Sequence, residues 1–242
     1  GISFIHYIFL PVLGMRLFLF AILLSITTVA SAQKKELAGI DSLIRSGKFT
    51  EAEAALKKIK GDEALIKSHY GLLYMMQTRY DLALEDLQAA IDLFEKNNNA
   101  TSLEAAEALV HLGNVFRITG KYMQAEEQFN QALMIRQEKL PANHELIAAI
   151  YNDLGLVYTE LNPDKSIEYY EKALETYRKL HGEDDPKIAI GNTNLGIVYA
   201  KEKLYGDAIN YYETALKIWE KVYLKPHANK ALVLMNLGHT YS

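Results

Sequence analysis

The sequence NLGIVY at residues 194–199 recurs through the chain with small changes. It returns as DLGLVY at residues 153–158 and NLGHTY at residues 236–241, and in weaker form as HLGNVF at residues 111–116 and HYGLLY at residues 69–74. The five glycines are separated by 42, 42, 41 and 42 residues. With glycine at a background frequency of about 7%, four further glycines at preset spacings arise by chance on the order of once in 10⁵. The chain therefore contains an internal repeat.

Other positions vary with the same period. Each glycine is followed three residues later by an aromatic residue, and then by a small residue, a large apolar residue and an alanine. The large apolar residues are Leu87, Phe129, Tyr170 and Tyr212. The single 41-residue step falls at Leu161-Asn162-Pro163-Asp164, a turn one residue shorter than its equivalents.

Each unit predicts two helices joined by a short turn. Around Gly113, apolar residues recur at helical spacing, the turn Thr119-Gly120-Lys121-Tyr122 follows, and a second apolar helix face begins at Ala125. A glycine inside a helix costs about 1 kcal/mol relative to alanine, so five glycines at one register need a structural reason. We expect the missing Cβ to let the two helices approach closely, with the aromatic residues filling the wider gaps.

This pattern resembles the tetratricopeptide repeat, which is usually 34 residues long. Here about eight residues are added, and no proline ends the second helix. The longer repeat is similar to the 42-residue variety of kinesin light chains and of many exported bacterial proteins. The resemblance covers nearly everything after residue 33 and implies an all-α fold, a right-handed superhelical solenoid of antiparallel helix pairs.

The repeat divides the chain into segments. We interpret residues 1–32 as a signal peptide preceded by upstream sequence at residues 1–14, residues 33–66 as a degenerate N-terminal capping repeat, and residues 67–242 as four repeats plus a truncated fifth. Because the chain stops inside the first helix of that fifth repeat, we expect it to be a fragment of a longer protein.

The N-terminal segment predicts export. Met15-Arg16 precedes an apolar run from Leu17 to Val29 and the small residues Ala30-Ser31-Ala32, which is the order of a secretory signal. The run is shorter than the roughly 20 residues that cross a bilayer, which favours cleavage after Ala32 and a periplasmic or secreted protein. The alternative is that Ile2 to Ala32 form an uncleaved signal anchor that tethers the protein to a membrane.

Composition argues against several kinds of chemistry. The net charge of −4 without a basic tail disfavours nucleic-acid binding, and the absence of cysteine excludes disulfides and thiolate zinc sites. His69 and His111 lie one repeat apart, roughly 10 Å, which is too far for one metal ion held near 2 Å from each ligand. Because no catalytic or phosphate-binding motif is present, we expect no enzyme activity within these residues, no cofactor and no metal.

Candidate binding residues come from the first helix of each pair, because these helices line the concave face of such a solenoid. The concave positions lie three and two residues before each glycine and one and four after it. Asparagines recur there, and an amide can both donate to and accept from a peptide backbone. No lysine occupies these positions, so we do not predict the carboxylate clamp of some family members. The candidate peptide-binding residues are Leu72, Met75, Asn114, Arg117, Asn152, Leu156, Thr193, Asn194 and Ile197.

Two functions follow as hypotheses. The first is an exported scaffold that binds a protein or peptide partner on its concave face and contacts a membrane only through the N-terminal segment or a missing C-terminal part. The second, implied by the resemblance, is the sensing or regulatory region of a longer protein. Its output domain, a caspase-like peptidase or a membrane histidine kinase or transcriptional regulator, would lie beyond Ser242.

Overall fold

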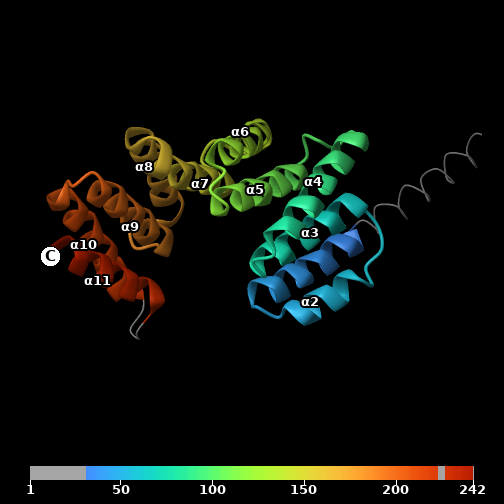
Figure 1. Ribbon diagram of the computed structural model, residues 1–242, viewed down its shortest axis with the longest axis horizontal. Coiled ribbons are helices and arrows are strands. Elements are labelled where there is room, and N and C mark those ends of the chain that lie inside the picture. Colours follow the sequence, from blue (N-terminus) through green and yellow to red (C-terminus); the bar gives the residue numbers. More distant parts are fainter. Residues whose placement is uncertain (1–30, 223–226, 242) are drawn as a thin grey trace, which may run out of the picture. The chain divides into compact units, whose positions relative to one another are not determined.

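The computed structural model describes residues 31–222 and 227–241, and all regular structure within them is helical (Figure 1). The predicted all-α fold of antiparallel helix pairs is therefore confirmed. The contacts divide the chain into two compact units, unit 1 up to Phe94 and unit 2 from Glu95 onward, and each is described by itself. Nearly all of the expected signal peptide lies outside the described residues.

Unit 1 contains a helix over residues 31–45, then α2 (Phe49–Leu56), α3 (Glu63–Met76) and most of α4 (Tyr80–Lys96). Ile44, Ala52 and Leu73 are completely buried in its core. Ala52 is the small residue of the expected capping repeat. It lies in the same buried cluster as Leu73 of α3, so the first helix pair packs on α3. Polar contacts add to this packing, since Lys67 Nζ lies 2.6 Å from Asp86 Oδ1.

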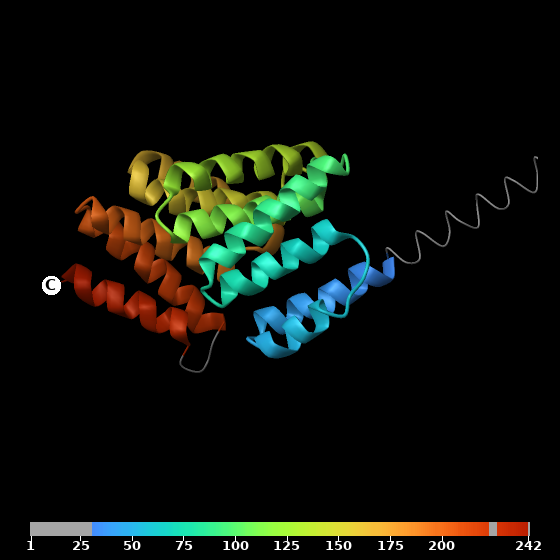
Figure 2. The same ribbon diagram turned by 45° about the vertical axis from the view of Figure 1, so that its right-hand side comes forward.

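Unit 2 is a succession of helix pairs (Figure 2). Within each pair α5 packs on α6, α7 on α8 and α9 on α10, and between pairs α6 packs on α7, α8 on α9 and α10 on α11. The bounds are α5 (Leu103–Ile118), α6 (Tyr122–Lys139), α7 (Glu145–Leu161), α8 (Pro163–His181), α9 (Pro186–Lys201), α10 (Tyr205–Val222) and α11 (Ala228–Tyr241).

Local sequence sets where several of these helices begin. The side chain of Ser102 accepts a hydrogen bond from the backbone N–H of Ala105 at 3.0 Å and so caps α5. Two later helices begin with a capping residue followed by proline: Asn162 caps α8 and Asp185 caps α9. Proline suits the first helical position, where its missing N–H costs nothing.

The turns within pairs explain the one short repeat. Four of them have three residues, and the middle residue has a positive φ of 77° at Gly47, 60° at Thr78, 76° at Gly120 and 61° at Lys203. Between α7 and α8 only Asn162 remains, with an extended φ of −161°. Replacing a left-handed turn by an extended cap followed by proline thus shortens the connection.

The repeated glycines lie directly beneath the large apolar residues of the following helix. A Cβ built on Gly113, Gly155 or Gly196 would lie 2.5 to 2.8 Å from a ring carbon of the paired aromatic residue. Real Cβ atoms do not approach other atoms so closely, so glycine is required at these positions. The expected close approach is confirmed for four pairs: Gly71 with Leu87, Gly113 with Phe129, Gly155 with Tyr170 and Gly196 with Tyr212.

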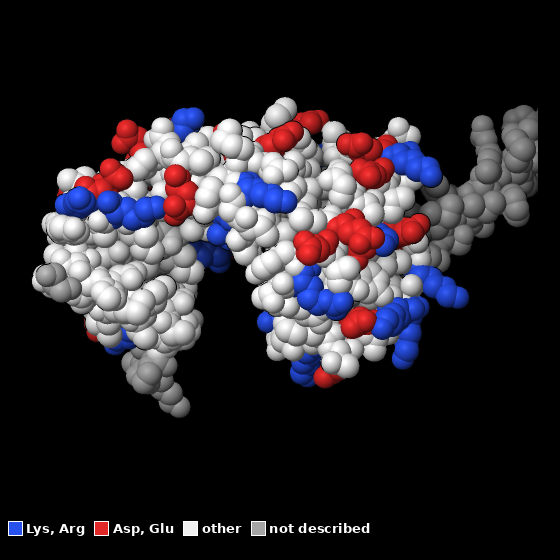
Figure 3. All heavy atoms as spheres, in the orientation of Figure 1, with Lys and Arg blue, Asp and Glu red and all other residues white. Residues whose placement is uncertain are grey.

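The surface carries charges of both signs. On the face shown in Figure 3, lysine and arginine side chains alternate with aspartate and glutamate on each unit. No helix among the described residues combines the length and the apolar character needed to cross a bilayer.

Candidate functional site

The candidate site is the surface of unit 2 formed by the first helices of its pairs, which we call the inner face. It comprises Arg117 from α5, Leu156 and Thr159 from α7, Asn194, Ile197, Ala200 and Lys201 from α9, and Asn236 and His239 from α11. The close packing of glycine against aromatic residue fixes α5, α7 and α9 on their partner helices, and α11 packs on α10 and α9, so the inner face is held by the buried core behind it.

Two pockets open on the inner face. The first has a volume of about 220 Å³ and is lined by Arg117, Tyr122, Leu156, Thr159, Glu160, Tyr170, Asn194 and Ile197. The second has a volume of about 320 Å³ and is lined by Ile197, Ala200, Lys201, Tyr205, Tyr212, Asn236, His239 and Thr240. Ile197 lines both, so the pockets are neighbours.

The second pocket repeats the first by one structural unit. Six residues of the first pocket have counterparts 41 or 42 residues later in the second. They are Leu156, Thr159, Glu160, Tyr170, Asn194 and Ile197, which correspond to Ile197, Ala200, Lys201, Tyr212, Asn236 and His239. The internal repeat therefore reproduces a pocket as well as a helix pair.

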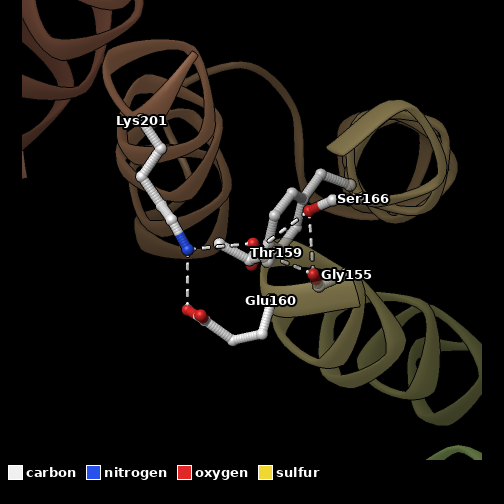
Figure 4. A network of polar contacts seen from close by, with 6 residues as sticks. Gly155, Thr159, Glu160, Ser166 and Lys201 are labelled. Atoms are coloured by element: carbon white, nitrogen blue, oxygen red, sulfur yellow. Dashed lines mark hydrogen bonds and ion pairs between the residues drawn. The ribbon is translucent and has the colours of Figure 1, made fainter. Parts of the chain in front are cut away.

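Glu160 of the first pocket and Lys201 of the second form an ion pair, which Figure 4 shows. Lys201 from α9 donates to the backbone carbonyl of Thr159 at 3.0 Å and pairs with Glu160 Oε1 at 2.9 Å. Both charged side chains are nearly half exposed, so solvent weakens the pair and its main role is to position the two side chains between the pockets.

Hydroxyl groups form the floor of the first pocket. Ser166, which is completely buried, donates to the carbonyl oxygen of Gly155 at 2.8 Å and lies 2.9 Å from Thr159 Oγ1. The Tyr170 hydroxyl lies 3.3 Å from the same Thr159 oxygen. This network fixes the tyrosine ring that packs over Gly155 and shapes the pocket above it.

The predicted asparagines form contacts within the protein. Asn194 Nδ2 donates to Asn152 Oδ1 at 3.1 Å and so connects α9 to α7. Asn114 accepts from Arg117 at 3.1 Å and donates to a carbonyl of its own helix. Asn236 differs, because its Nδ2 is buried without a hydrogen-bond partner among the described residues. The Nδ2 of Asn236 is therefore available to donate a hydrogen bond to a ligand.

A partly buried carboxyl group, that of Asp153, follows Asn152 in α7. Burial raises the pKa of Asp153 from 3.8 to about 6. The positive charges of Arg117 and Arg136 oppose this shift without cancelling it. Arg136 is only 5% exposed, and burial lowers the pKa of its guanidinium group. The site therefore holds a carboxyl group that titrates close to neutral pH beside two arginines.

The structure places the predicted residues in three different settings. Arg117, Leu156, Asn194 and Ile197 line the first pocket together, and Asn114 and Asn152 adjoin them through hydrogen bonds. Met75 belongs to unit 1 and packs partly buried against its core. The remaining two predicted residues are buried, and no partner could touch them.

Leu72 and Thr193 are thus corrections to the expected binding surface. Leu72 is 3% exposed within the core of unit 1. Thr193 is 5% exposed, and its hydroxyl donates to the carbonyl of Ala189 in the same helix. The hydrogen bond from Asn194 to Asn152 joins residues 42 apart, one more than the glycine spacing of 41, so Asn194 and not Thr193 contacts Asn152.

The sequence analysis missed other pocket residues. Glu160 and Lys201 lie five residues after their glycines, one beyond the last position considered, and their opposite charges at equivalent positions were an available signal. Asn236 and His239 occupy concave positions around Gly238, in the truncated fifth repeat. Tyr122 and Tyr205 begin second helices, where no binding position was expected.

Metal chemistry finds no support in the part of the chain that the structure describes. No three histidine, aspartate or glutamate side chains gather there as a possible metal site. His69 instead contacts its surroundings in unit 1, with Nδ1 2.7 Å from the carbonyl oxygen of Leu65 and Nε2 3.5 Å from Asp41 Oδ1.

Comparison with known proteins identifies the repeat. A family model described as tetratricopeptide repeat matches residues 62–138, 104–179, 146–202 and 187–242. The chain is 24% identical over 191 residues to Protein KINESIN LIGHT CHAIN-RELATED 1 of Arabidopsis thaliana, covering 78% of the chain and 27% of that protein. It is 30% identical over 101 residues to the nuclear autoantigenic sperm protein of Bos taurus, covering 41% and 13%. The chain thus spans about a quarter or less of these relatives.

Solved structures share the fold. BtubC (BKLC) from P. vanneervenii is 25% identical with a TM-score of 0.67, covering 82% of this chain and 84% of that one. The apo quorum sensor NprR from B. thuringiensis has a TM-score of 0.70 at 19% identity, covering 86% and 58%. NprR in complex with its cognate peptide NprX has a TM-score of 0.66 at 17% identity, covering 86% and 61%. At these identities the NprR structures show similarity of fold alone.

Proposed function

The chain belongs to the tetratricopeptide repeat family, in its kinesin-light-chain-like variety, and we propose that it is a binding scaffold without catalytic activity in these residues. Unit 2 would hold a peptide segment of a protein partner on the inner face. The observation that carries this proposal is the presence of two adjacent pockets that share Ile197. Adjacent pockets suit a chain-like ligand with successive side chains.

The composition of the inner face supports the same ligand class. Leu156 and Ile197 supply apolar contact area, while Arg117 and Asn236 each have a buried side-chain nitrogen without a hydrogen-bond partner among the described residues. A peptide offers both apolar side chains and backbone carbonyl oxygens. NprR, whose solved complex contains a peptide, provides an example of a related fold that binds this class of ligand.

Two substitutions on α9 test the scaffold role. Ile197→Glu places a carboxylate between the pockets, whereas Ile190→Glu places one on an exposed part of the same helix. Each protein would be expressed in the source cells, and the proteins co-purifying with it would be quantified. The proposal expects a partner that is lost with Ile197→Glu and retained with Ile190→Glu, with both variants folded by circular dichroism. Equal partner recovery from both variants would contradict it.

We also propose that the protein is exported, on the basis of the basic, apolar and small-residue order from Met15 to Ala32. The test is the mass of the native protein with its terminal peptides identified. A mature species that begins at Gln33 supports export with cleavage, and retention of the apolar segment contradicts cleavage. A much larger species would favour the second hypothesis, a regulatory region of a longer protein.

A further inference from the structure

The two pockets of the inner face are equivalent sites one repeat apart, and this sets their separation. Their corresponding residues lie on α7 and α9 for the first pocket and on α9 and α11 for the second. These first helices contact one another directly, α7 with α9 and α9 with α11. Packed helices lie 8 to 10 Å apart, so a ligand that fills both pockets must present two side chains on one side at about that distance.

Peptide conformations differ in whether they meet this condition. In polyproline II conformation, residues i and i+3 lie on the same side and about 9.3 Å apart, because there are three residues per turn and about 3.1 Å per residue. In a β-strand, i and i+2 share a side at only about 6.7 Å, and i+3 points away. An α-helix advances about 10 Å only after seven residues.

We propose that unit 2 selects a peptide in polyproline II conformation with large apolar side chains at positions i and i+3. This proposal rests on the scaffold function proposed above. One side chain enters each pocket, and Ile197 lies between them. The volumes of about 220 and 320 Å³ are near or below the lower limit of sites for drug-sized ligands and suit single side chains.

The pocket walls fit apolar side chains, including proline. Tyr122 and Tyr170 line the first pocket, and Tyr205 and Tyr212 line the second. Grooves lined by aromatic side chains are a recurring means of binding polyproline II peptides, because the preformed peptide loses little conformational entropy.

The backbone of such a peptide also needs hydrogen-bond donors. A polyproline II chain has no internal hydrogen bonds, so its carbonyl oxygens are free to accept. Asn236 Nδ2 lies at the second pocket, buried and without a hydrogen-bond partner in the described part of the chain. It is the group that we expect to donate to a carbonyl oxygen of the bound peptide.

A display library of short random peptides tests the spacing. Selection against the full chain should enrich large apolar residues three positions apart, and selection against Ile197→Glu should not. Enriched peptides with a spacing of two, four or seven would overturn the polyproline II proposal and leave the scaffold function intact. Failure to select any peptide that depends on Ile197 would overturn both.

Filling one pocket provides a sharper test. Ala200→Phe should occupy the second pocket, so that the selected peptides keep only one apolar anchor and the parent peptide binds about tenfold more weakly. Ala142→Phe, in an exposed loop, is the matched control and should change neither the number of apolar anchors nor the affinity for the parent peptide. Asn236→Ala should weaken peptide binding about fivefold or more without changing the spacing of the apolar anchors. Asn210→Ala, at an exposed position of α10, should have no effect. An unchanged two-anchor pattern with folded Ala200→Phe would refute the assignment.

Peptide conformation can be tested directly on a selected sequence. Proline at the two positions between the anchors favours polyproline II and should strengthen binding severalfold, while glycine at the same positions should weaken it. Loss of binding on introducing proline would indicate a β-strand or helical ligand and would contradict the proposal.

Discussion

Tyr212 fills the space that a Cβ on Gly196 would need, since that atom would lie 2.5 Å from its ring carbon Cε1. The tyrosine is 2% exposed and cannot move aside without disturbing the core. Gly196→Ala should therefore lower the free energy of unfolding by about 1 to 3 kcal/mol, despite the higher helix propensity of alanine. Urea denaturation followed by the fluorescence of Trp219, the sole tryptophan, measures this change.

Gly206→Ala is the matched control for that substitution. Gly206 lies in the first turn of α10, and a Cβ there would meet no heavy atom within 4 Å. Alanine should raise the free energy of unfolding there by up to about 1 kcal/mol, because it is the better helix former. Equal losses in both variants would mean that close packing over Gly196 is not the cause.

Stability should depend on pH through Asp153. Its pKa in the folded protein is about 6, above the ordinary value of 3.8, so the folded state holds a proton that the unfolded state releases. The stabilisation is complete below about pH 4, falls as pH rises towards 6, and is lost above it. Asp153→Asn should therefore raise the free energy of unfolding at pH 7.5 by up to about 3 kcal/mol relative to wild type.

The difference between wild type and Asp153→Asn across pH 4 to 8 is the quantity to measure, because other carboxylates contribute to both proteins alike. Asn210→Ala, which removes no ionisable group from an exposed position of α10, should give a nearly constant difference over the same range. A constant difference for Asp153→Asn would show that the burial of Asp153 does not control its titration.

The hydrogen bond between Asn152 and Asn194 should contribute about 1 kcal/mol to the free energy of unfolding. Asn152→Ala, Asn194→Ala and the double variant should all lose about this amount, since either substitution removes the same bond. A double-mutant cycle measures the coupling. Strictly additive losses would mean that the two amides act independently, and an unfolded double variant would mean that they are essential to the fold.

Lys201 should matter little for stability, because Lys201 and Glu160 are 44% and 45% exposed. Lys201→Met should change the free energy of unfolding by less than about 1 kcal/mol. Thermal unfolding at low and high salt is the appropriate measurement, and the small wild-type advantage should shrink as salt increases. A larger, salt-independent loss would assign the stabilisation to the hydrogen bond with the Thr159 carbonyl instead.

Much of the fold was predictable because one spacing governs many positions at once. The glycine and the large apolar residue of each pair share a period, and their contact in the structure follows from that shared period, as at Gly155 and Tyr170. The short turn at Asn162 could also be predicted, since a deletion in one connection leaves the flanking helices in register.

The candidate site was less predictable because it depends on how neighbouring helix pairs are offset. Counting from glycines placed Thr193 beside Asn152, whereas the contact across the pairs joins Asn152 to Asn194. The pairing of Lys201 with Glu160, in contrast, keeps the glycine spacing of 41 residues. In the middle of an array, the position that Leu72 occupies faces the concave surface. In unit 1 the same position packs into the core, so the burial of Leu72 was not predicted.

Each of the four packed glycines and the large apolar residue that covers it lie within a single helix pair, and this has a consequence for how such a protein can change in evolution. Duplication of one 42-residue segment would copy both halves of the contact together, along with one pocket of the inner face. A gene could therefore lengthen or shorten the array by unequal recombination without any compensating substitution in the core. Each such event would change the number of pockets on the inner face while preserving the residues that line every remaining pocket.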